Sequence, residues 1–344
     1  MSKWLILAIV ATCAIYSPIR GAPLVFEDHV YVRAASHPTT TKSLLQPRGL
    51  TILTMRWNRL LVPSADTPSA YHLANLFLHG VVGLAVYGLG AAIVGPQLAL
   101  VGAALFLIHP LNSEAGDYVA GRAELIMAAG IVLAVWAAVS GHNFLALIAT
   151  IVAVGGKELG VMAIPLCILT VAMFKGVRRN MLVAGVVFIA LVIAVIQLRM
   201  VDNVYLLTSQ KSGIEYMAVQ SWALWQMLGL FVWPAGLSLD HDMELLTTAG
   251  TLVALAVGLM VVVWAFLLRR AVPVFSWAVA WVVISLLPRF FVRIPEYLNE
   301  HQMYTPMIGL CLAAPVVVKG VYEYVARCGR YIFGHDRLVS ADAG

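Results

Sequence analysis

Long apolar runs separated by short acidic islands are the feature that most constrains this chain. Hydrophobic residues make up 61% of the sequence and charged residues 11%, which is under half the charged share of a typical soluble domain. One soluble core cannot bury so many apolar side chains, so the sequence predicts an all-α polytopic membrane protein. Acids near hydrocarbon are costly, by about 3 kcal/mol at a helix centre on insertion scales, and usually mark a site. The islands are Glu27-Asp28, Glu114 with Asp117 and Glu124, Lys157-Glu158, Asp240-His241-Asp242, and Glu296 with Glu300-His301.

Apolar runs that can cross roughly 30 Å of hydrocarbon predict about ten transmembrane helices. A further run, residues 221–239, is rich in Trp but is interrupted by Pro234 and Gly236, so we interpret it as a re-entrant or interfacial helix. The predicted spans are residues 3–19, 71–94, 97–109, 124–140, 143–156, 159–174, 181–199, 249–268, 272–288 and 303–319.

The first apolar run has the length of a signal-peptide core, but Pro23 disfavours cleavage after it. We therefore expect this run to be kept as the first transmembrane helix. The predicted organisation is one transmembrane domain over residues 1–320 and a cytoplasmic tail over residues 321–344. Within the domain, residues 20–70 form a first extracytoplasmic loop that carries short helices.

The charges predict one orientation in the membrane. With the N-terminus inside, the basic clusters at 175–179 and 269–270 face the cytosol, as the positive-inside rule expects, although the first loop carries six Lys or Arg. The acids divide more sharply, because only Glu323, Asp336 and Asp342 of the 17 fall inside. Every acidic island then faces the extracytoplasmic side. The basic residues form no contiguous stripe, which argues against nucleic-acid binding.

Glu27 and Asp28 follow the first apolar run directly. An aspartate that is partly desolvated at the lipid boundary has a pKa suited to accepting a proton from a hydroxyl nucleophile. The alternative is an acid that caps a helix in a solvated loop, and the pair by itself favours neither reading.

Five further segments combine His, Asn, Arg and acids in a fixed order. They are Tyr71–His79 (YHLANLFLH), His109–Ala115 (HPLNSEA) with Gly121–Leu125 (GRAEL), Lys157–Gly160 (KELG), Leu237–His241 (LSLDH) and Asn299–Pro306 (NEHQMYTP). With the acidic pair after the first helix, this order resembles the GT-C superfamily of integral membrane glycosyltransferases. Within it, the likeness is to the membrane part of the TMTC-type protein O-mannosyltransferases and their bacterial relatives, over about residues 26 to 310. The first pair is Glu-Asp rather than Asp-Asp, and the tetratricopeptide repeats of the animal proteins are absent, which leaves the acceptor open.

The resemblance implies a GT-C-like fold that transfers a monosaccharide from a polyprenyl-phosphate-linked donor to a hydroxyl of an extracytoplasmic protein or glycan. Asp28, or else Glu27, would take the proton of that hydroxyl. The donor phosphate would be bound by Arg122, Lys157, Arg289 and Arg293. The residues expected to support the site are His79, His109, Glu114, Asp117, Glu124, Glu158, Asp240, His241, Glu300 and His301.

The cations keep alternative readings. Arg122 can fork onto a phosphate or pair structurally with Glu124 or Asp117. Lys157-Glu158 has the same two readings, and the arginines at 289 and 293 can instead anchor to lipid headgroups.

No metal is expected, and no cofactor beyond the lipid-linked donor. Asp240-His241-Asp242 has ligand-type side chains, but adjacent loop residues seldom all ligate one ion. His72 and His79 share one helical face and are more typical of hydrogen bonds between helices.

The sequence therefore predicts a GT-C-type glycosyltransferase of the bacterial inner (plasma) membrane, with its site on the extracytoplasmic side. Its partners would be the lipid donor, a surface or secreted acceptor and other membrane proteins. A transporter or flippase for a lipid-linked or polar solute is the main alternative. Transporters place ionisable residues near the bilayer midplane in repeated halves, whereas these acids lie at span ends. A non-catalytic membrane subunit is a third class.

Overall fold

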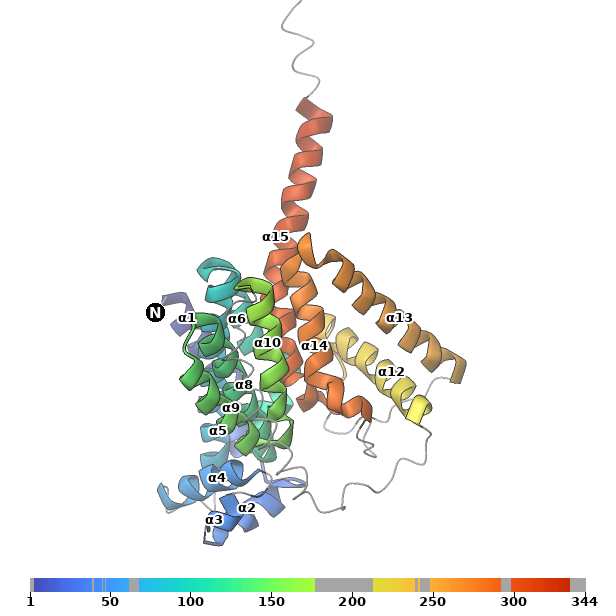
Figure 1. Ribbon diagram of the computed structural model, residues 1–344. Coiled ribbons are helices and arrows are strands. Elements are labelled where there is room, and N and C mark those ends of the chain that lie inside the picture. The colour runs from blue at the N-terminus through green and yellow to red at the C-terminus, as the bar shows by residue number, and fades with distance from the viewer. Residues whose placement is uncertain are drawn as a thin grey trace, which may run out of the picture.

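The computed structural model describes residues 3–38, 40–44, 46, 48–61, 68–176, 213–238, 241, 248–291 and 298–334. Every regular element within these ranges is a helix (Figure 1). The predicted all-α class is therefore confirmed for the described residues. The predicted span at 181–199 lies outside them.

The N-terminal part holds one apolar helix and a group of short ones. They are α1 (Lys3–Tyr16), the 3-10 turn η1 (Ser17–Gly21), α2 (Asp28–Ser36), α3 (Thr41–Leu44) and α4 (Gly49–Leu61). The helices α2, α3 and α4 gather at one end of the molecule (Figure 1). The short helices expected between residues 20 and 70 are thus present.

A tightly packed bundle follows, with α8 at its centre. Its elements are α5 (Pro68–Ile93), α6 (Pro96–Ile108), η2 (Pro110–Asn112), α7 (Ser113–Asp117), η3 (Val119–Gly121), α8 (Arg122–Ser140), α9 (Asn143–Gly156), η4 (Glu158–Met162) and α10 (Ala163–Phe174). Gly95 and Gly141 adopt φ of 88° and 86°, which allows the tight turns before α6 and after α8. Helix α8 is apolar on all sides and is buried along most of its length, as such a helix must be.

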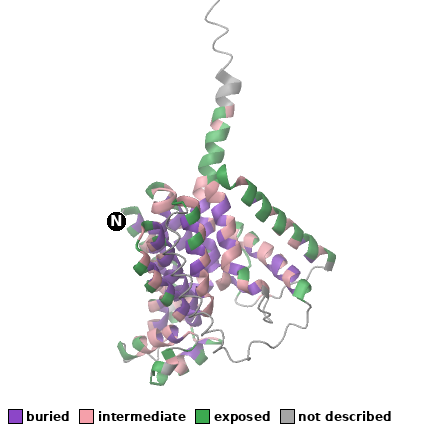
Figure 2. Cartoon of the chain, in the orientation of Figure 1, coloured by how far each residue is buried: buried purple, intermediate pink, exposed green. Residues whose placement is uncertain are grey.

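The C-terminal part consists of α12 (Gly213–Val232), α13 (Thr248–Leu267), η7 (Leu268–Arg270), α14 (Pro273–Phe291), η8 (Glu300–Met303) and α15 (Tyr304–Gly334). Helix α13 lies at the outside and is largely exposed in Figure 2. Only 17% of its apolar stretch is buried, which suits a helix that faces lipid. Helix α12 covers part of the re-entrant or interfacial helix expected at 221–239, but it begins earlier, at Gly213. It ends at Val232, directly before Trp233-Pro234.

The expectation of about ten transmembrane helices is too high for the described residues. Five helices are long and apolar enough to cross a membrane, or six if Pro96–Ile108 and Pro110–Asp117, bent by 59°, form one broken span. The predicted spans at 3–19, 143–156 and 159–174 correspond closely to the apolar helices Lys3–Ile19, Asn143–Gly156 and Glu158–Phe174, which are too short to count among these five or six. The sequence therefore predicted the bounds of these three helices closely, and the error was to count each of them as a full crossing.

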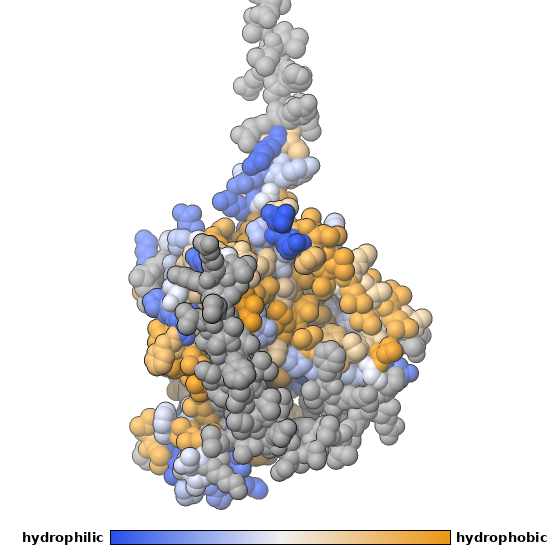
Figure 3. Space-filling model, in the orientation of Figure 1, coloured by the Kyte–Doolittle hydropathy of each residue, from blue (hydrophilic) through white to orange (hydrophobic). Residues whose placement is uncertain are grey.

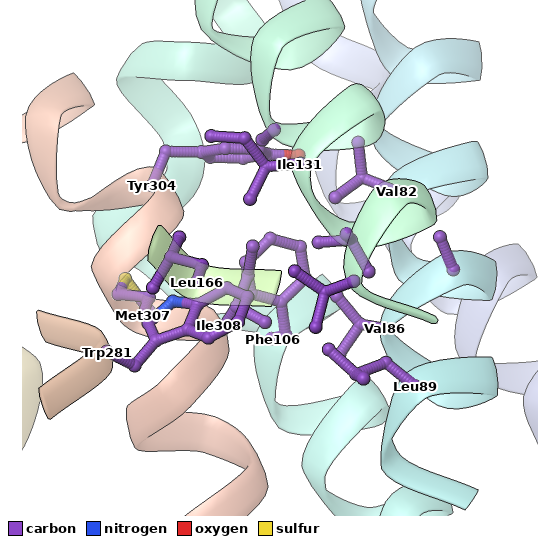
Figure 4. Packing of buried hydrophobic residues seen from close by; sticks show 14 of the residues in the cluster. Val82, Val86, Leu89, Phe106, Ile131, Leu166, Trp281, Tyr304, Met307 and Ile308 are labelled. Carbon is purple, nitrogen blue, oxygen red and sulfur yellow. The ribbon is translucent and has the colours of Figure 1, made fainter. Parts of the chain in front are cut away.

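The hydropathy of the surface is banded. Hydrophobic side chains dominate the coloured surface in the middle of Figure 3, hydrophilic ones gather where α15 projects, and the α2–α4 end carries both kinds. The turn η7, with Arg269 and Arg270, joins α13 and α14 at this second end. Inside the band, aromatic and aliphatic side chains from α5, α6, α8, α10, α14 and α15 meet, among them Phe106, Trp281 and Tyr304 (Figure 4).

A close contact between α8 and α9 gives a stability prediction. A Cβ at Gly130 of α8 would lie 2.5 Å from the backbone nitrogen of Ala153 in α9, which neither backbone can relieve locally. Gly130→Ala should therefore lower the free energy of unfolding by about 1–3 kcal/mol, despite the better helix propensity of Ala. Gly229→Ala in α12, where nothing lies within 4 Å, is the control and should be neutral or stabilising. Thermal unfolding in detergent measures both, and equal stability of the two variants would contradict this packing.

Candidate functional site

The acidic islands within the described residues meet at the α2–α4 end of the bundle. Side-chain contacts run from Glu27 to Arg48, on to Glu158, and separately from Lys157 through Glu124 to His301 and Glu114. These residues come from the start of α2, the segment before α4, α7, the start of α8, η4 and η8. Segments far apart in the sequence are thus joined at one polar end of a membrane protein.

Asp28 is the first residue of α2 and is 1% exposed. Its Oδ1 accepts a hydrogen bond from the backbone N–H of Ala120 at 2.8 Å, and its Oδ2 accepts one from Val25 at 3.1 Å. Burial raises the pKa of the Asp28 carboxyl, and the two amides, with His72 and His29, only partly oppose that rise. The residue is therefore a desolvated carboxylate in a fixed position, which is what a general base requires.

Glu27 precedes it but is placed differently. Its side chain is 64% exposed, and its Oε2 lies 4.0 Å from Nη1 of Arg48. Its backbone N–H donates to the hydroxyl of Tyr118 at 2.9 Å. Of the two acids, Asp28 is the one held by the fold.

Arg48 was not among the residues selected from the sequence, although it lies between the acids. Its Nη2 and Nε are 3.4 and 3.5 Å from the Glu158 carboxylate, and its Nη1 donates to the Tyr31 hydroxyl. Its φ of 61° is rare for a residue other than glycine, and such strained positions gather at functional sites. The signal in the sequence was a lone Arg between Pro47 and Gly49 at the start of an amphipathic helix.

Lys157 and Glu124 form a buried ion pair. Nε2 of His301 lies 3.9 Å from Glu124 Oε1, while its Nδ1 lies 2.6 Å from Glu114 Oε1. The backbone N–H of His301 donates to Glu114 Oε2 at 2.7 Å. This chain fixes η8 against α7 and the start of α8.

Glu300 makes a second acid–histidine contact. Its Oε1 lies 2.7 Å from Nε2 of His241 and accepts the backbone N–H of Ser238, also at 2.7 Å. The neighbours Glu300 and His301 therefore pair with two different segments. Asp240 lies outside the described residues.

Arg122 follows neither of its two expected readings in a simple way. It is 1% exposed, and it makes no ion pair with Glu124 or Asp117 among the described residues, because Glu124 pairs with Lys157. Its donors are directed at neutral oxygens: Nε at Asn75 Oδ1 (2.7 Å), and Nη2 at Asn58 Oδ1 (3.1 Å) and the Tyr71 carbonyl (2.9 Å). Within the described residues the structure therefore shows no such ion pair, and a role in binding phosphate stays a prediction.

His79 on α5 and His109, directly after α6, hydrogen-bond to other helices. Nε2 of His79 is 3.0 Å from the Leu107 carbonyl and Nδ1 is 2.6 Å from the Tyr304 hydroxyl, so Nε2 carries the hydrogen and Nδ1 accepts. His109 binds the Phe231 carbonyl at 2.9 Å in the same manner and stacks on that ring. Asp117 is half-buried at the end of α7.

Arg289 belongs to a pocket between α12, α14 and η8. Its Nε lies 3.5 Å from Gln220 Oε1, and apolar side chains such as Met227 and Leu286 line most of the remainder. Arg293 lies outside the described residues. Within the ranges that the structure describes, no group of three or more His, Cys, Asp or Glu could hold a metal ion.

The chain is similar in sequence to known proteins. No family model matches the chain. It is 30% identical to Protein O-mannosyl-transferase TMTC3 of Homo sapiens over 134 residues, 35% of this chain and 14% of that protein. It is 26% identical to a Protein O-mannosyl-transferase of Caenorhabditis elegans over 321 residues, 86% of this chain and 45% of that protein. It is 33% identical to Protein O-mannosyl-transferase TMTC4 of Mus musculus over 95 residues, 24% of this chain and 13% of that protein.

The chain is a distant homologue of the TMTC-type protein O-mannosyltransferases. The resemblance seen in the motifs is thus confirmed. The chain spans less than half the length of these curated relatives.

The buried ion pair gives the second prediction. Lys157→Met leaves the Glu124 carboxylate desolvated without its cation, so the free energy of unfolding should fall by about 3–5 kcal/mol. The double variant Lys157→Met with Glu124→Gln should recover most of that loss. Lys319→Met is the matched control, because the Lys319–Glu323 pair is exposed and should matter little. Thermal unfolding in detergent compares the three, and a double variant as unstable as the single one would refute the pairing.

Proposed function

We propose that this chain is a membrane glycosyltransferase that transfers a monosaccharide from a polyprenyl-phosphate-linked donor to a hydroxyl group of an extracytoplasmic protein or glycan. The observation that carries the proposal is Asp28. A desolvated carboxylate, held by two backbone amides, lies at one polar end of the helices. Its chain neighbour Glu27 contacts Arg48, and Arg48 contacts Glu158. The homology to protein O-mannosyltransferases supports the same class of reaction.

In the proposed reaction, Asp28 takes the proton from the acceptor hydroxyl. The hydroxyl oxygen then attacks the anomeric carbon of the donor sugar, and the bond to the phosphate oxygen breaks, so that the polyprenyl phosphate leaves. Each Asp28 oxygen accepts one amide and keeps a second lone pair, so the carboxylate can still receive the proton. The two amide hydrogen bonds fix the orientation of the Asp28 carboxylate and therefore the direction in which its remaining lone pairs point.

The leaving phosphate needs positive charge, and the cations differ in how free they are to supply it. Lys157 is bound to Glu124, and Arg122 is enclosed by neutral oxygens. Arg48 is about a quarter exposed, and its contacts with Glu158, at 3.4 and 3.5 Å, are longer than a good charged hydrogen bond. We therefore infer that Arg48 meets the donor phosphate and that Lys157 adds to the field.

The donor is a lipid, so its site must be open to the hydrocarbon. Arg289, Gln220 and Gln302 are the polar residues in a mostly apolar pocket between α12 and α14, beside η8. This setting suits a phosphate with an apolar chain attached, and we propose that the polyprenyl chain runs along these helices.

The proposal also needs one orientation: the α2–α4 end outside and the projecting end of α15 in the cytoplasm. The basic residues Arg269 and Arg270 lie at the α15 end, as the positive-inside rule requires. The acids lie at the opposite end of the helices rather than in the middle of the hydrophobic band. That arrangement favours an enzyme at a membrane face over a transporter with a midplane site.

Removal of the base tests the mechanism. Asp28→Asn should lower turnover of a polyprenyl-phosphate sugar by about 10²–10⁴-fold with little change in donor binding, because only proton transfer is lost. Initial rates and donor binding on purified protein measure this, with thermal unfolding as the control for folding. Glu27→Gln is the comparison, and full activity of Asp28→Asn with loss in Glu27→Gln would move the base to Glu27.

Arg48 has its own prediction. Arg48→Lys keeps the charge but loses the planar fork, so the KM for the donor should rise roughly tenfold or more, with a smaller effect on kcat. Arg33→Lys is the matched control, since Arg33 lies on the neighbouring α2 with an exposed side chain. Steady-state kinetics at varied donor concentration measure both. An unchanged donor KM in Arg48→Lys would remove Arg48 from the donor site.

A further inference from the structure

Arg122 is a buried cation whose hydrogen bonds go to neutral oxygens. It sits over the Tyr71 ring, with 5.6 Å between the guanidinium carbon and the ring centroid, at the first turn of α8. Among the described residues no carboxylate lies within ion-pair distance of it. A charge in such a place survives only if its donors are well satisfied. The structural effect of Arg122 therefore lies in the hydrogen bonds that it donates to particular oxygens rather than in the neutralisation of an acid.

Asn75 carries that direction onward. It is fully buried on α5, and its Oδ1 accepts from Arg122 Nε at 2.7 Å. Its Nδ2 donates to the carbonyls of Tyr118 and Val119, at 2.9 and 3.4 Å. An Arg side chain can only donate, so it fixes which end of the Asn75 amide is the acceptor. The NH₂ end must then face the two carbonyls.

The segment that receives these bonds is the one that holds Asp28. Residues 118–120 join α7 to α8, and the N–H of Ala120 donates to Asp28 Oδ1 at 2.8 Å. The Tyr118 hydroxyl accepts the N–H of Glu27, just before Asp28. One hydrogen-bonded path thus runs from Arg122 through Asn75 and residues 118–120 to the carboxylate.

We propose that Arg122 and Asn75 are positioning residues, which hold residues 118–120 so that the Ala120 N–H meets Asp28 and fixes the direction of its carboxylate. The inference rests on the proposed function only in giving Asp28 the role of base. It differs from the expectation that Arg122 binds the donor phosphate. The path itself is a property of the folded chain and can be measured without any sugar transfer.

The protonation of Asp28 reports on this path. The Ala120 amide stabilises the charged carboxylate, so weakening that bond raises the pKa of Asp28 further above its usual range. The other titratable groups that face Asp28 are His29 on α2, His72 on α5, and Tyr118, with Glu27 next to it in the chain. Of these residues, Asn75 hydrogen-bonds only to Tyr118, which belongs to the path itself.

The decisive variant is Asn75→Asp. It keeps an acceptor for Arg122, now as an ion pair, but it places a carboxylate oxygen against the carbonyls of Tyr118 and Val119, which repel it. The control is Asn112→Asp, the same change at an equally buried Asn whose Nδ2 also donates to a carbonyl, that of Phe106 at 2.6 Å. Infrared titration of the purified proteins in detergent follows the Asp28 carboxyl, assigned by its absence in Asp28→Asn. Transfer from a polyprenyl-phosphate sugar is measured alongside over the same pH range.

We expect the Asp28 titration to move to higher pH in Asn75→Asp and to stay in place in Asn112→Asp. The acid limb of kcat/KM should move with it, and turnover should fall roughly tenfold or more. A folded Asn75→Asp that titrates like the unaltered protein overturns the proposal. If Asn75→Asp does not fold, Asn75→Ser, which removes the amide without adding charge, decides in the same way. A shifted titration in proteins that transfer no sugar at all would support the positioning path and refute the proposed function.

Discussion

The polar end of this protein depends on the cost of removing an acid from water without a partner. Glu124 has Lys157, Glu114 has His301, and Glu300 has His241. In each case the partner comes from a segment that is distant in the sequence, so forming the pair also brings those two segments together. The desolvation penalty of an unpaired charge, several kcal/mol, exceeds the gain from any one apolar contact, so these pairs determine how the helix ends align.

Close packing in the hydrophobic band transmits that alignment along the helices. Small residues allow α8 and α9 to approach until Gly130 meets the backbone of Ala153. Gly160 in η4 makes a similar approach to Ala153, which fixes η4 and therefore Lys157 and Glu158. These close approaches bring the segment with Lys157 and Glu158 near Glu124 and Arg48. The apolar half of the structure thus positions the charged half.

The helical class could be predicted from the sequence because it follows from apolar length. The islands were also expected to meet, although the count of ten spans behind that expectation was too high. The partners could not be predicted, because pairing depends on which side chains face one another across helices. Glu124 was a candidate partner of Arg122 by proximity in sequence, yet it turns to Lys157. Arg48 was missed because a lone Arg in a loop has no distinctive spacing. The number of spans was overestimated because the broken segment from α6 to α7 and three short helices count as full runs in hydropathy alone.

Asn at position 75 orients its hydrogen-bond partners rather than providing a charge that attracts Arg122. A carboxylate there would pair better with Arg122, but it would have no hydrogen to give to the carbonyls of residues 118 and 119. An amide has one accepting end and one donating end, so a donor-only neighbour on one side fixes what it offers on the other. Arg122 is such a neighbour, and its charge is tolerated because Asn58 and the Tyr71 carbonyl satisfy Nη2. A cation with neutral partners is therefore what the orientation of Asp28 requires.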